Sequence, residues 1–150
     1  MKKIVYAFLI LLLTGCAGYK PIFSNKGIGF HIGHIKNIDN DNISKQIIKN
    51  LNPYTVKNEK PEIRLEIKSN KKENIVSRDN KGDPQIHEIK IQTNIKIIKN
   101  TQIKELEFKE NFSFNNQNNK FEFSQYKKNI QKNLTNRIFE KLIIELQSIK

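Results

Sequence analysis

The C-terminal segment of the chain carries an apolar residue at every fourth position. The repeat consists of Tyr126, Ile130, Leu134, Ile138, Leu142 and Leu146. A spacing of four residues places side chains on one face of an α-helix, and neither glycine nor proline interrupts the segment. We therefore predict an amphipathic helix of about six or seven turns, roughly 35 Å long at 1.5 Å per residue. Ser124 is its predicted N-cap.

Three segments ahead of this helix alternate apolar and polar residues, which is typical of strands with one buried face. They are residues 63–67, with an irregular continuation to Val76, residues 89–97, and residues 106–114. Turn signals at 79–84 and 100–102 separate them, so we expect hairpins of antiparallel neighbours. Glu110 stands where the last alternation requires an apolar residue, and we expect a bulge or a strand end there.

An earlier strand and a short helix complete the pattern. Residues 30–38 suggest a strand that is irregular near Gly33. A helix follows, capped by Asp41 or Asn42 and ended by Pro53; its apolar stripe is Ile43, Ile47, Ile48 and Leu51. One-sided strands need a cover, so we predict a two-layer α+β sandwich with both helices on one face of a mostly antiparallel sheet of about four strands. The position of the first strand stays open. A basic membrane-surface helix is the alternative for the C-terminal stripe, and we favour core packing.

The chain begins with the features of an export signal. Lys2 and Lys3 precede an apolar run, residues 4–13, which is too short for a transmembrane helix of about 20 residues. The run ends in Leu13-Thr14-Gly15-Cys16, which resembles a bacterial lipobox, whose cysteine is acylated. Cys16 is the only cysteine, so it cannot form an internal disulfide. We predict a lipoprotein signal peptide at 1–15, a lipidated tether at 16–29 and a single α+β domain at 30–150.

The chain is strongly basic, with a formal net charge of +12. Loss of Lys2 and Lys3 with the signal would leave 12 − 2 = +10 on the mature chain. Such a charge favours anionic partners, and export argues against nucleic acid. An AT-rich genome also encodes abundant Lys, Asn and Ile, so part of the charge reflects composition. Candidate anion contacts project from the wet face of the sheet and its hairpin tips: Lys68, Lys71, Lys72, Arg78, Lys81, Lys90 and Lys96. A solvated charged face is the alternative for each of them alone.

Motifs of catalysis and metal binding are absent from the sequence. His31 and His34 are three residues apart on a predicted strand and so face opposite sides. The sequence contains no HExxH, GxGxxG or Gly-x-Ser-x-Gly. Glu105 and Glu107 alternate with apolar residues and read as a solvated face. We therefore expect no enzymatic activity, no metal site and no cofactor.

One run gives a specific resemblance. Cys16-Ala17-Gly18-Tyr19-Lys20-Pro21-Ile22-Phe23 is similar to the start of the mature lipopolysaccharide-assembly lipoproteins of the LptE family, in their alphaproteobacterial form, with Ala17 inserted. The order of predicted elements is similar too. So is the passage from Phe112-Ser113-Phe114-Asn115 through Ser124-Gln125-Tyr126 into the last helix. This chain departs from the family in having lysines and asparagines, rather than alanines, after that tyrosine.

The resemblance implies an outer-membrane lipoprotein on the periplasmic side. Such a protein lodges inside, and helps assemble, the β-barrel that inserts lipopolysaccharide into the outer leaflet. The implied partners are this barrel, lipopolysaccharide itself, and the membrane through the lipid anchor. The residues alone also allow a lipid-anchored periplasmic module that binds another anionic envelope component, such as cell-wall polymer or phospholipid headgroups.

Overall fold

The computed structural model describes residues 30–56 and 63–149. The predicted signal peptide, the tether and Cys16 lie outside these residues. The described elements, in chain order, are β1 (Ile32–Asn37), α2 (Asn42–Leu51), the 3-10 helix η2 (Asn52–Tyr54), β2 (Ile63–Arg78), β3 (Pro84–Lys99), β4 (Gln102–Asn115) and α3 (Lys120–Ser148).

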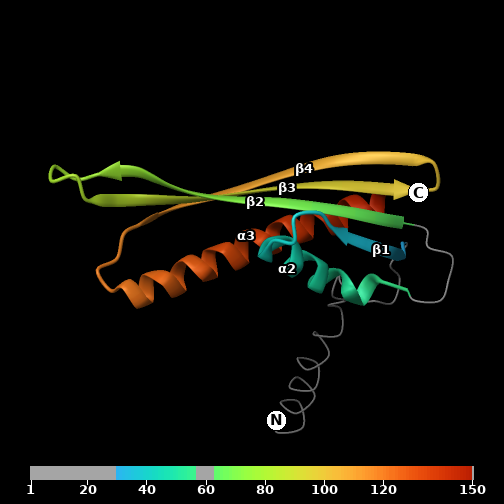
Figure 1. Ribbon diagram of the computed structural model, residues 1–150, viewed down its shortest axis with the longest axis horizontal. Helices are drawn as coiled ribbons and strands as arrows, with labels where there is room; N and C mark the ends of the chain where they lie inside the picture. Colours follow the sequence, from blue (N-terminus) through green and yellow to red (C-terminus); the bar gives the residue numbers. More distant parts are fainter. Residues whose placement is uncertain (1–29, 57–62, 150) are drawn as a thin grey trace, which may run out of the picture.

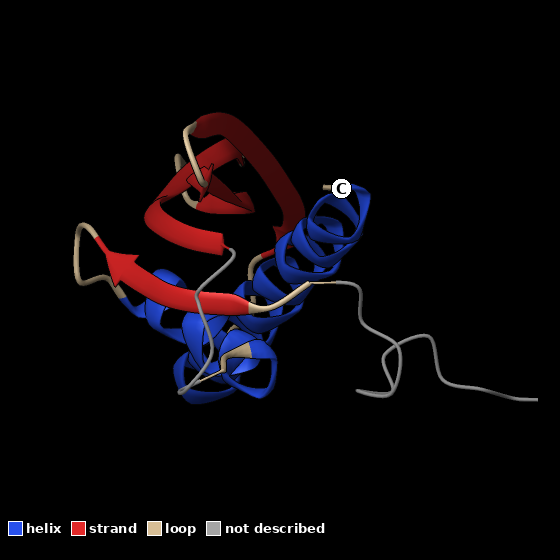
Figure 2. Cartoon of the chain, turned by 90° about the vertical axis from the view of Figure 1, so that its right-hand side faces the viewer, coloured by secondary structure: helices blue, strands red, loops and turns tan. Residues whose placement is uncertain are grey.

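These elements form two layers, with the sheet on one side and both helices on the other (Figures 1 and 2). The strand order is β1-β2-β3-β4. Strand β1 runs parallel to β2, whereas β2, β3 and β4 are antiparallel neighbours. The predicted α+β sandwich is therefore confirmed, and the first strand takes the edge beside β2.

The short elements at the start of the fold follow their sequence signals. The pairing of β1 with β2 shifts between Ile32 and His34, which confirms the irregularity predicted near Gly33. The carboxylate of Asp41 caps α2 by accepting hydrogen bonds from the backbone N–H groups of Ile43 at 2.7 Å and Ser44 at 3.0 Å. Helix α2 ends at Leu51, and Pro53 lies in the 3-10 turn that follows.

The core lies between the sheet and the two helices. The buried side chains of β2 and β3 come from one phase of each strand; they are Ile63, Leu65, Ile67, Ile89, Ile91, Ile95 and Ile97. The buried residues of α3 include Ile130, Leu134, Ile138, Leu142 and Leu146, so the period-four stripe is core. A buried chain of hydroxyls joins α2 to the sheet: Ser44 Oγ lies 2.9 Å from Ser69 Oγ, which lies 3.0 Å from Thr93 Oγ1.

Glu110 marks neither a bulge nor a strand end, so that prediction is wrong. The pairing of β3 with β4 runs without a shift, and Glu110 lies opposite Ile91. Its side chain is 10% exposed on the helix-facing side of β4, where Lys141 of α3 donates a hydrogen bond to it. Arg137 of α3 lies 3.9 Å away. An ion pair with the helix therefore explains the acidic residue in an apolar phase.

Helix α3 begins earlier than predicted, and Ser124 is not its N-cap. Asn119 caps it, because the side-chain oxygen of Asn119 accepts hydrogen bonds from the backbone N–H groups of Phe121 at 3.0 Å and Glu122 at 3.2 Å. Asn119 has extended backbone angles, as an N-cap requires. The helix has 29 residues, which corresponds to about 43 Å at 1.5 Å per residue.

Replacing Asn119 by Ala is expected to lower the free energy of unfolding by about 1 kcal/mol, the usual cost of losing an N-cap side chain. Ser124→Ala is the matched control, because Ser124 lies inside the helix and Ala has the higher helix propensity. Urea unfolding followed by circular dichroism measures both changes. A larger loss for Ser124→Ala than for Asn119→Ala would contradict the assigned cap.

Candidate anion-binding surface

The helices leave the other face of the sheet open (Figure 1). Charged side chains of both signs project from this face. The basic ones are Arg64, Lys68, Lys72, Lys90, Lys96 and Lys109, and the acidic ones are Glu66, Glu88, Glu105 and Glu107. They stand there because the buried phase of each strand faces the helices, and the intervening residues point the other way.

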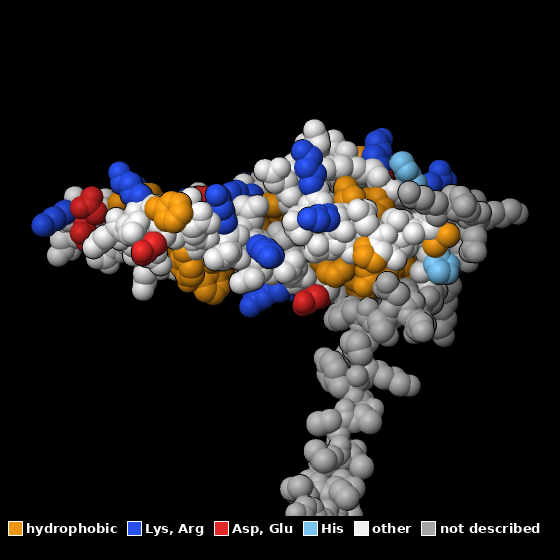
Figure 3. All heavy atoms as spheres, turned by 90° about the horizontal axis from the view of Figure 1, so that it is seen from below, with side chains coloured by type: hydrophobic (Ala, Val, Ile, Leu, Met, Phe, Trp, Pro, Cys, Tyr) orange, Lys and Arg blue, Asp and Glu red, His pale blue; other side chains and the backbone are white. Residues whose placement is uncertain are grey.

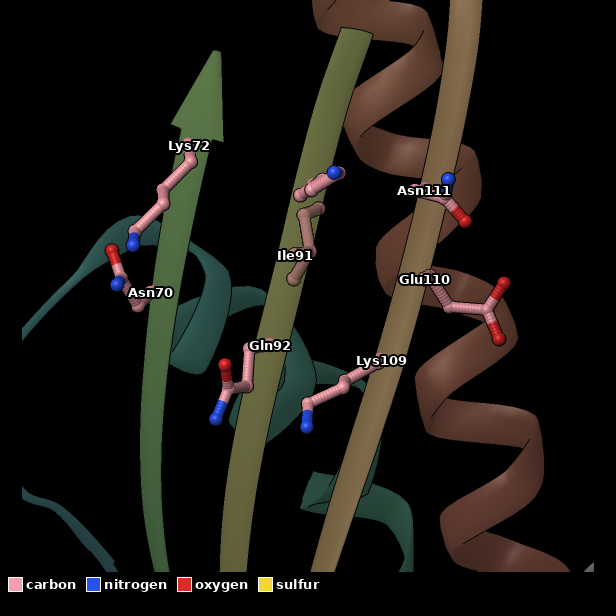
Figure 4. Close-up of a pocket in the computed structure, with 8 residues that line it drawn as sticks. Asn70, Lys72, Ile91, Gln92, Lys109, Glu110 and Asn111 are labelled. Atoms are coloured by element: carbon pink, nitrogen blue, oxygen red, sulfur yellow. The ribbon is translucent and has the colours of Figure 1, made fainter. Parts of the chain in front are cut away.

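A hollow of about 390 Å³ lies on the open face across β2, β3 and β4. Its polar side chains come in pairs, one pair from each strand, and are Asn70, Lys72, Lys90, Gln92, Lys109 and Asn111 (Figure 4). Ile91 and Glu110 also border the hollow. Both belong to the helix-facing phase, and Figure 4 shows the Glu110 side chain beside α3. The hollow therefore presents ammonium and carboxamide groups.

The register places two of these cations against each other. Lys72 lies directly opposite Lys90 in the β2–β3 ladder, and like charges in that position destabilise a sheet. Lys90 forms a salt bridge of 2.9 Å with Glu88, and Lys109 forms one of 2.7 Å with Glu107. Lys72 forms no salt bridge with any residue that the structure describes. It is therefore the least compensated charge of the hollow.

Glu88 lies beside the hollow, next to Lys90 and Asn111. The side-chain amide of Asn111 donates a hydrogen bond of 3.0 Å to Glu88. This bond, together with the ammonium of Lys90, holds the pKa of Glu88 below its ordinary value. Because Glu88 offsets only one cation, the hollow keeps excess positive charge from Lys72. Ammonium and amide N–H groups are the donors that bind phosphate and carboxylate oxygens.

The structure distributes the predicted contact residues over several places. Lys72 and Lys90 meet in the hollow. Lys68 and Lys96 lie on the same face around a second hollow that is also lined by Glu66, Glu105 and Glu107. Lys68 lies 3.7 Å from Asp39, and Lys96 lies 3.8 Å from Glu105. Acidic neighbours therefore offset the charge at that end of the sheet.

Lys71 does not project from the open face. It belongs to the phase of β2 that includes Ile67 and Ser69, and its ammonium donates a hydrogen bond of 2.9 Å to Glu73. That hydrogen bond is the main cause that lowers the pKa of Glu73, and Lys127 of α3 adds to it at 3.1 Å. The assignment of Lys71 to the wet face is therefore corrected.

The two basic residues predicted at the hairpin tip do lie there. Arg78 donates a hydrogen bond of 2.8 Å to the backbone carbonyl of Gly82, which braces the turn. Lys81 is exposed within that turn. The tip is thus separate from the hollow, and the predicted residues do not form one cluster.

Lys109, Asn70, Gln92 and Asn111 were not predicted as site residues. Asn70, Gln92 and Lys109 form one row across the three strands, and Lys72, Lys90 and Asn111 form the next. Each of these residues occupies a polar position in the alternation of its strand, which can be seen in the sequence. The missing information was the register, which sets the residues that lie opposite one another.

Within residues 30–56 and 63–149, no three His, Cys, Asp or Glu side chains gather as a metal site would require. None of the described helices combines the length and apolar composition that crossing a membrane requires. His87 stacks on Phe114 at 5.8 Å and meets the edge of Phe123 at 5.0 Å, which places it in an aromatic cluster. The absence of enzymatic activity stays a prediction.

Several solved bacterial lipoproteins have a similar arrangement of the chain. Rare lipoprotein B of Shewanella oneidensis superposes with a TM-score of 0.59 at 7% identity, over 75% of this chain and 92% of that one. Lipoprotein B of Nitrosomonas europaea gives 0.55 at 13% identity, over 81% and 87% of the two chains. A minor lipoprotein of Acinetobacter baumannii gives 0.54 at 11% identity, over 79% and 94%.

The chain has the fold of these bacterial lipoproteins. At such low identity the likeness concerns the arrangement of the chain, not its chemistry. No protein-family model matches the sequence, and no curated protein matches it.

Proposed function

We propose that this chain is an outer-membrane lipoprotein of the LptE type, acylated at Cys16 and facing the periplasm. It supports assembly and operation of the β-barrel that inserts lipopolysaccharide, and it contacts lipopolysaccharide through the hollow on its sheet. Three observations support the proposal: the lipobox, the resemblance of residues 16–23 to that family, and the fold shared with solved lipoproteins. The role is non-catalytic.

The opposed pair Lys72 and Lys90 carries the assignment of the ligand site. A sheet gains nothing in stability from two ammonium groups in directly opposite positions. An anion between them would turn their repulsion into two attractive contacts, and charge-assisted hydrogen bonds of this kind are among the stronger ones. The amide of Asn70 is available to the hydroxyls of a sugar. The amides of Gln92 and Asn111 already donate to Glu107 and Glu88, and each keeps a second N–H group and an oxygen for the same purpose. Phosphorylated sugars carry both the anionic phosphate and the hydroxyl groups that these side chains would bind.

The barrel partner is proposed from the family resemblance. We propose that its contact surface lies away from the hollow, because charged residues, lysine among them, are depleted at the core of protein interfaces. Binding of the ligand and binding of the barrel should therefore separate by mutation.

The test is charge reversal in the hollow. We expect Lys72→Glu together with Lys90→Glu to weaken lipopolysaccharide binding by roughly tenfold, equivalent to about 1.4 kcal/mol. The matched control is Lys45→Glu together with Lys49→Glu, which makes the same charge change on exposed positions of α2. Binding at low and high salt, with circular dichroism as a check of folding, measures the effect. Equal losses in both variants would show that only net charge matters.

The same preparations test the partner. After gentle detergent extraction, an outer-membrane barrel should co-purify in stoichiometric amount with the wild type and with both variants. If no barrel is recovered, and the wild type binds cell-wall polymer or phospholipid vesicles as well as it binds lipopolysaccharide, the alternative of a general anion-binding envelope module becomes the better interpretation.

A further inference from the structure

Exposed hydrophobic side chains gather at one end of the molecule. Most of the large ones that are exposed lie around the β2–β3 hairpin and the start of α3; they are Ile75, Val76, Phe112, Phe121 and Tyr126. Phe121 is 71% exposed and Phe112 is 41% exposed. We call these five side chains the distal patch. Seen from the helix side, hydrophobic side chains near this narrow end stand among basic and acidic side chains (Figure 3).

An aromatic cluster supports the patch from beneath. Phe114 is buried at its centre, with 6% of its surface exposed. Its ring centroid lies 5.7 Å from Tyr126, 5.8 Å from Phe123 and 6.5 Å from Phe112. Two of the exposed rings, Phe112 and Tyr126, therefore pack on a buried ring, which fixes their positions.

The rest of the described fold does not cover this end. Strand β1 pairs with β2 only as far as Ile67, and α2 lies under the half of the sheet away from the hairpin tip (Figure 1). Only the first turns of α3 reach the distal end, and they expose Phe121 themselves. The buried stripe of α3 begins later, at Ile130.

Charged residues of both signs surround the patch. Lys120, Lys127 and Lys128 belong to the first turns of α3 together with Glu122, and Arg78 and Lys81 share the hairpin tip with Asp79 and Asp83. Lys127 is paired with Glu73, whereas Lys120 and Lys128 form no salt bridge with any residue that the structure describes. The ammonium of Lys127 lies 5.4 Å from the ring centre of Phe123. Exposed aromatic rings bordered by lysines are typical of surfaces that lie in the interface of a membrane with anionic headgroups.

We propose that the distal patch binds the surface of an anionic phospholipid bilayer. Phe121 and its neighbours would enter the boundary between headgroups and acyl chains, and Lys120 and Lys128 would meet lipid phosphates. The inference concerns a different surface from the hollow, and it depends neither on lipopolysaccharide binding nor on acylation of Cys16.

A second copy of the chain is the poorer occupant. In a two-fold dimer the same patch meets itself, so Lys120, Lys127 and Lys128 would face their own counterparts. A stable protein interface also needs roughly 20–30 residues a side, many more than the five side chains of the patch. A lipid surface instead neutralises the lysines and needs no matching shape.

The chain contains no tryptophan, so a single introduced tryptophan reports on one place. Phe121→Trp probes the patch. Ile103→Trp is the control, because Ile103 is 59% exposed on β4, near the β3–β4 turn and away from the hairpin tip. The full chain is purified in detergent, acylated or not, and reconstituted with phosphatidylcholine vesicles that contain or lack phosphatidylglycerol. Brominated phospholipids in the bilayer quench any tryptophan that enters it.

We expect a blue shift and loss of most of the emission of Phe121→Trp in the phosphatidylglycerol vesicles, with much smaller changes in neutral ones. The quenching of Ile103→Trp should not depend on lipid charge. Adding Lys120→Glu and Lys128→Glu to the Phe121→Trp chain should reverse its quenching. Equal quenching of the two tryptophans would overturn the proposal, and so would quenching of Phe121→Trp that does not depend on lipid charge. A blue shift that requires only a higher protein concentration, without lipid, would overturn it by showing self-association.

Discussion

Replacing Ile138 by Ala is expected to lower the free energy of unfolding by about 2–5 kcal/mol, the range for removing a large aliphatic side chain from a packed core. Ile138 lies near the middle of α3 and is 0% exposed. Its truncation leaves a cavity between α3 and the sheet, and the surrounding strands are too well paired to collapse into it. Urea unfolding followed by circular dichroism measures the loss.

Ile144→Ala provides the matched control on the same helix. Ile144 is 64% exposed, so the same truncation should change the free energy of unfolding by about 0.5 kcal/mol or less. Comparable losses at the two positions would contradict the assignment of the stripe to the core. So would an unchanged stability of the Ile138 variant accompanied by weaker binding to vesicles, because that result would place the stripe on a membrane.

Replacing Cys16 by Ser is expected to abolish incorporation of labelled palmitate and to leave residues 1–15 attached. The reason is that Cys16 supplies the only thiol in the chain, and acyl transfer to this position needs that sulfur. A single acyl chain holds a protein at a membrane only marginally, whereas two or more hold it stably. The variant should therefore lose its stable lipid anchorage.

Thr14→Ser is the control for Cys16→Ser, because it alters the neighbouring sequence and keeps the thiol. It should incorporate palmitate like the wild type. Palmitate in the Cys16→Ser variant would refute the anchor. Ala17 follows the cysteine, a pattern that resembles lipoproteins sent to the outer membrane, so recovery of the wild type in the inner membrane would contradict the proposed location.

Periodicity predicted the main elements correctly because their patterns are long and one-sided. Residues 63–67 and 89–97 alternate without exception in burial, and the stripe from Ile130 to Leu146 has the period of a helix. A sheet with one apolar face and a long helix with one apolar stripe can bury these two surfaces in few ways other than by packing against each other. The parallel position of β1 did not follow, because nothing in its own residues specifies a neighbour.

The errors came from partners that are distant along the chain or from competing local signals. Glu110 looked like a break in β4 because its partner, Lys141, is 31 residues away. Asn119 and Ser124 are both good N-caps, and only the backbone shows which one begins α3. For the hollow, the strand phases indicated open-face lysines, but the opposition of Lys72 and Lys90 required the register.

Glu110 also has a consequence for solubility. Strand β4 is the last in the sheet order, and its outer side pairs with no strand among the described residues. Such an edge can recruit a strand from another molecule and so start aggregation. A strand added there would bring its own side chains beside a carboxylate that is nearly buried and held by Lys141, and it would have to exclude the water around that ion pair. An inward-pointing charge in the last strand thus discourages edge-to-edge polymerisation, and an apolar residue at that position would favour it.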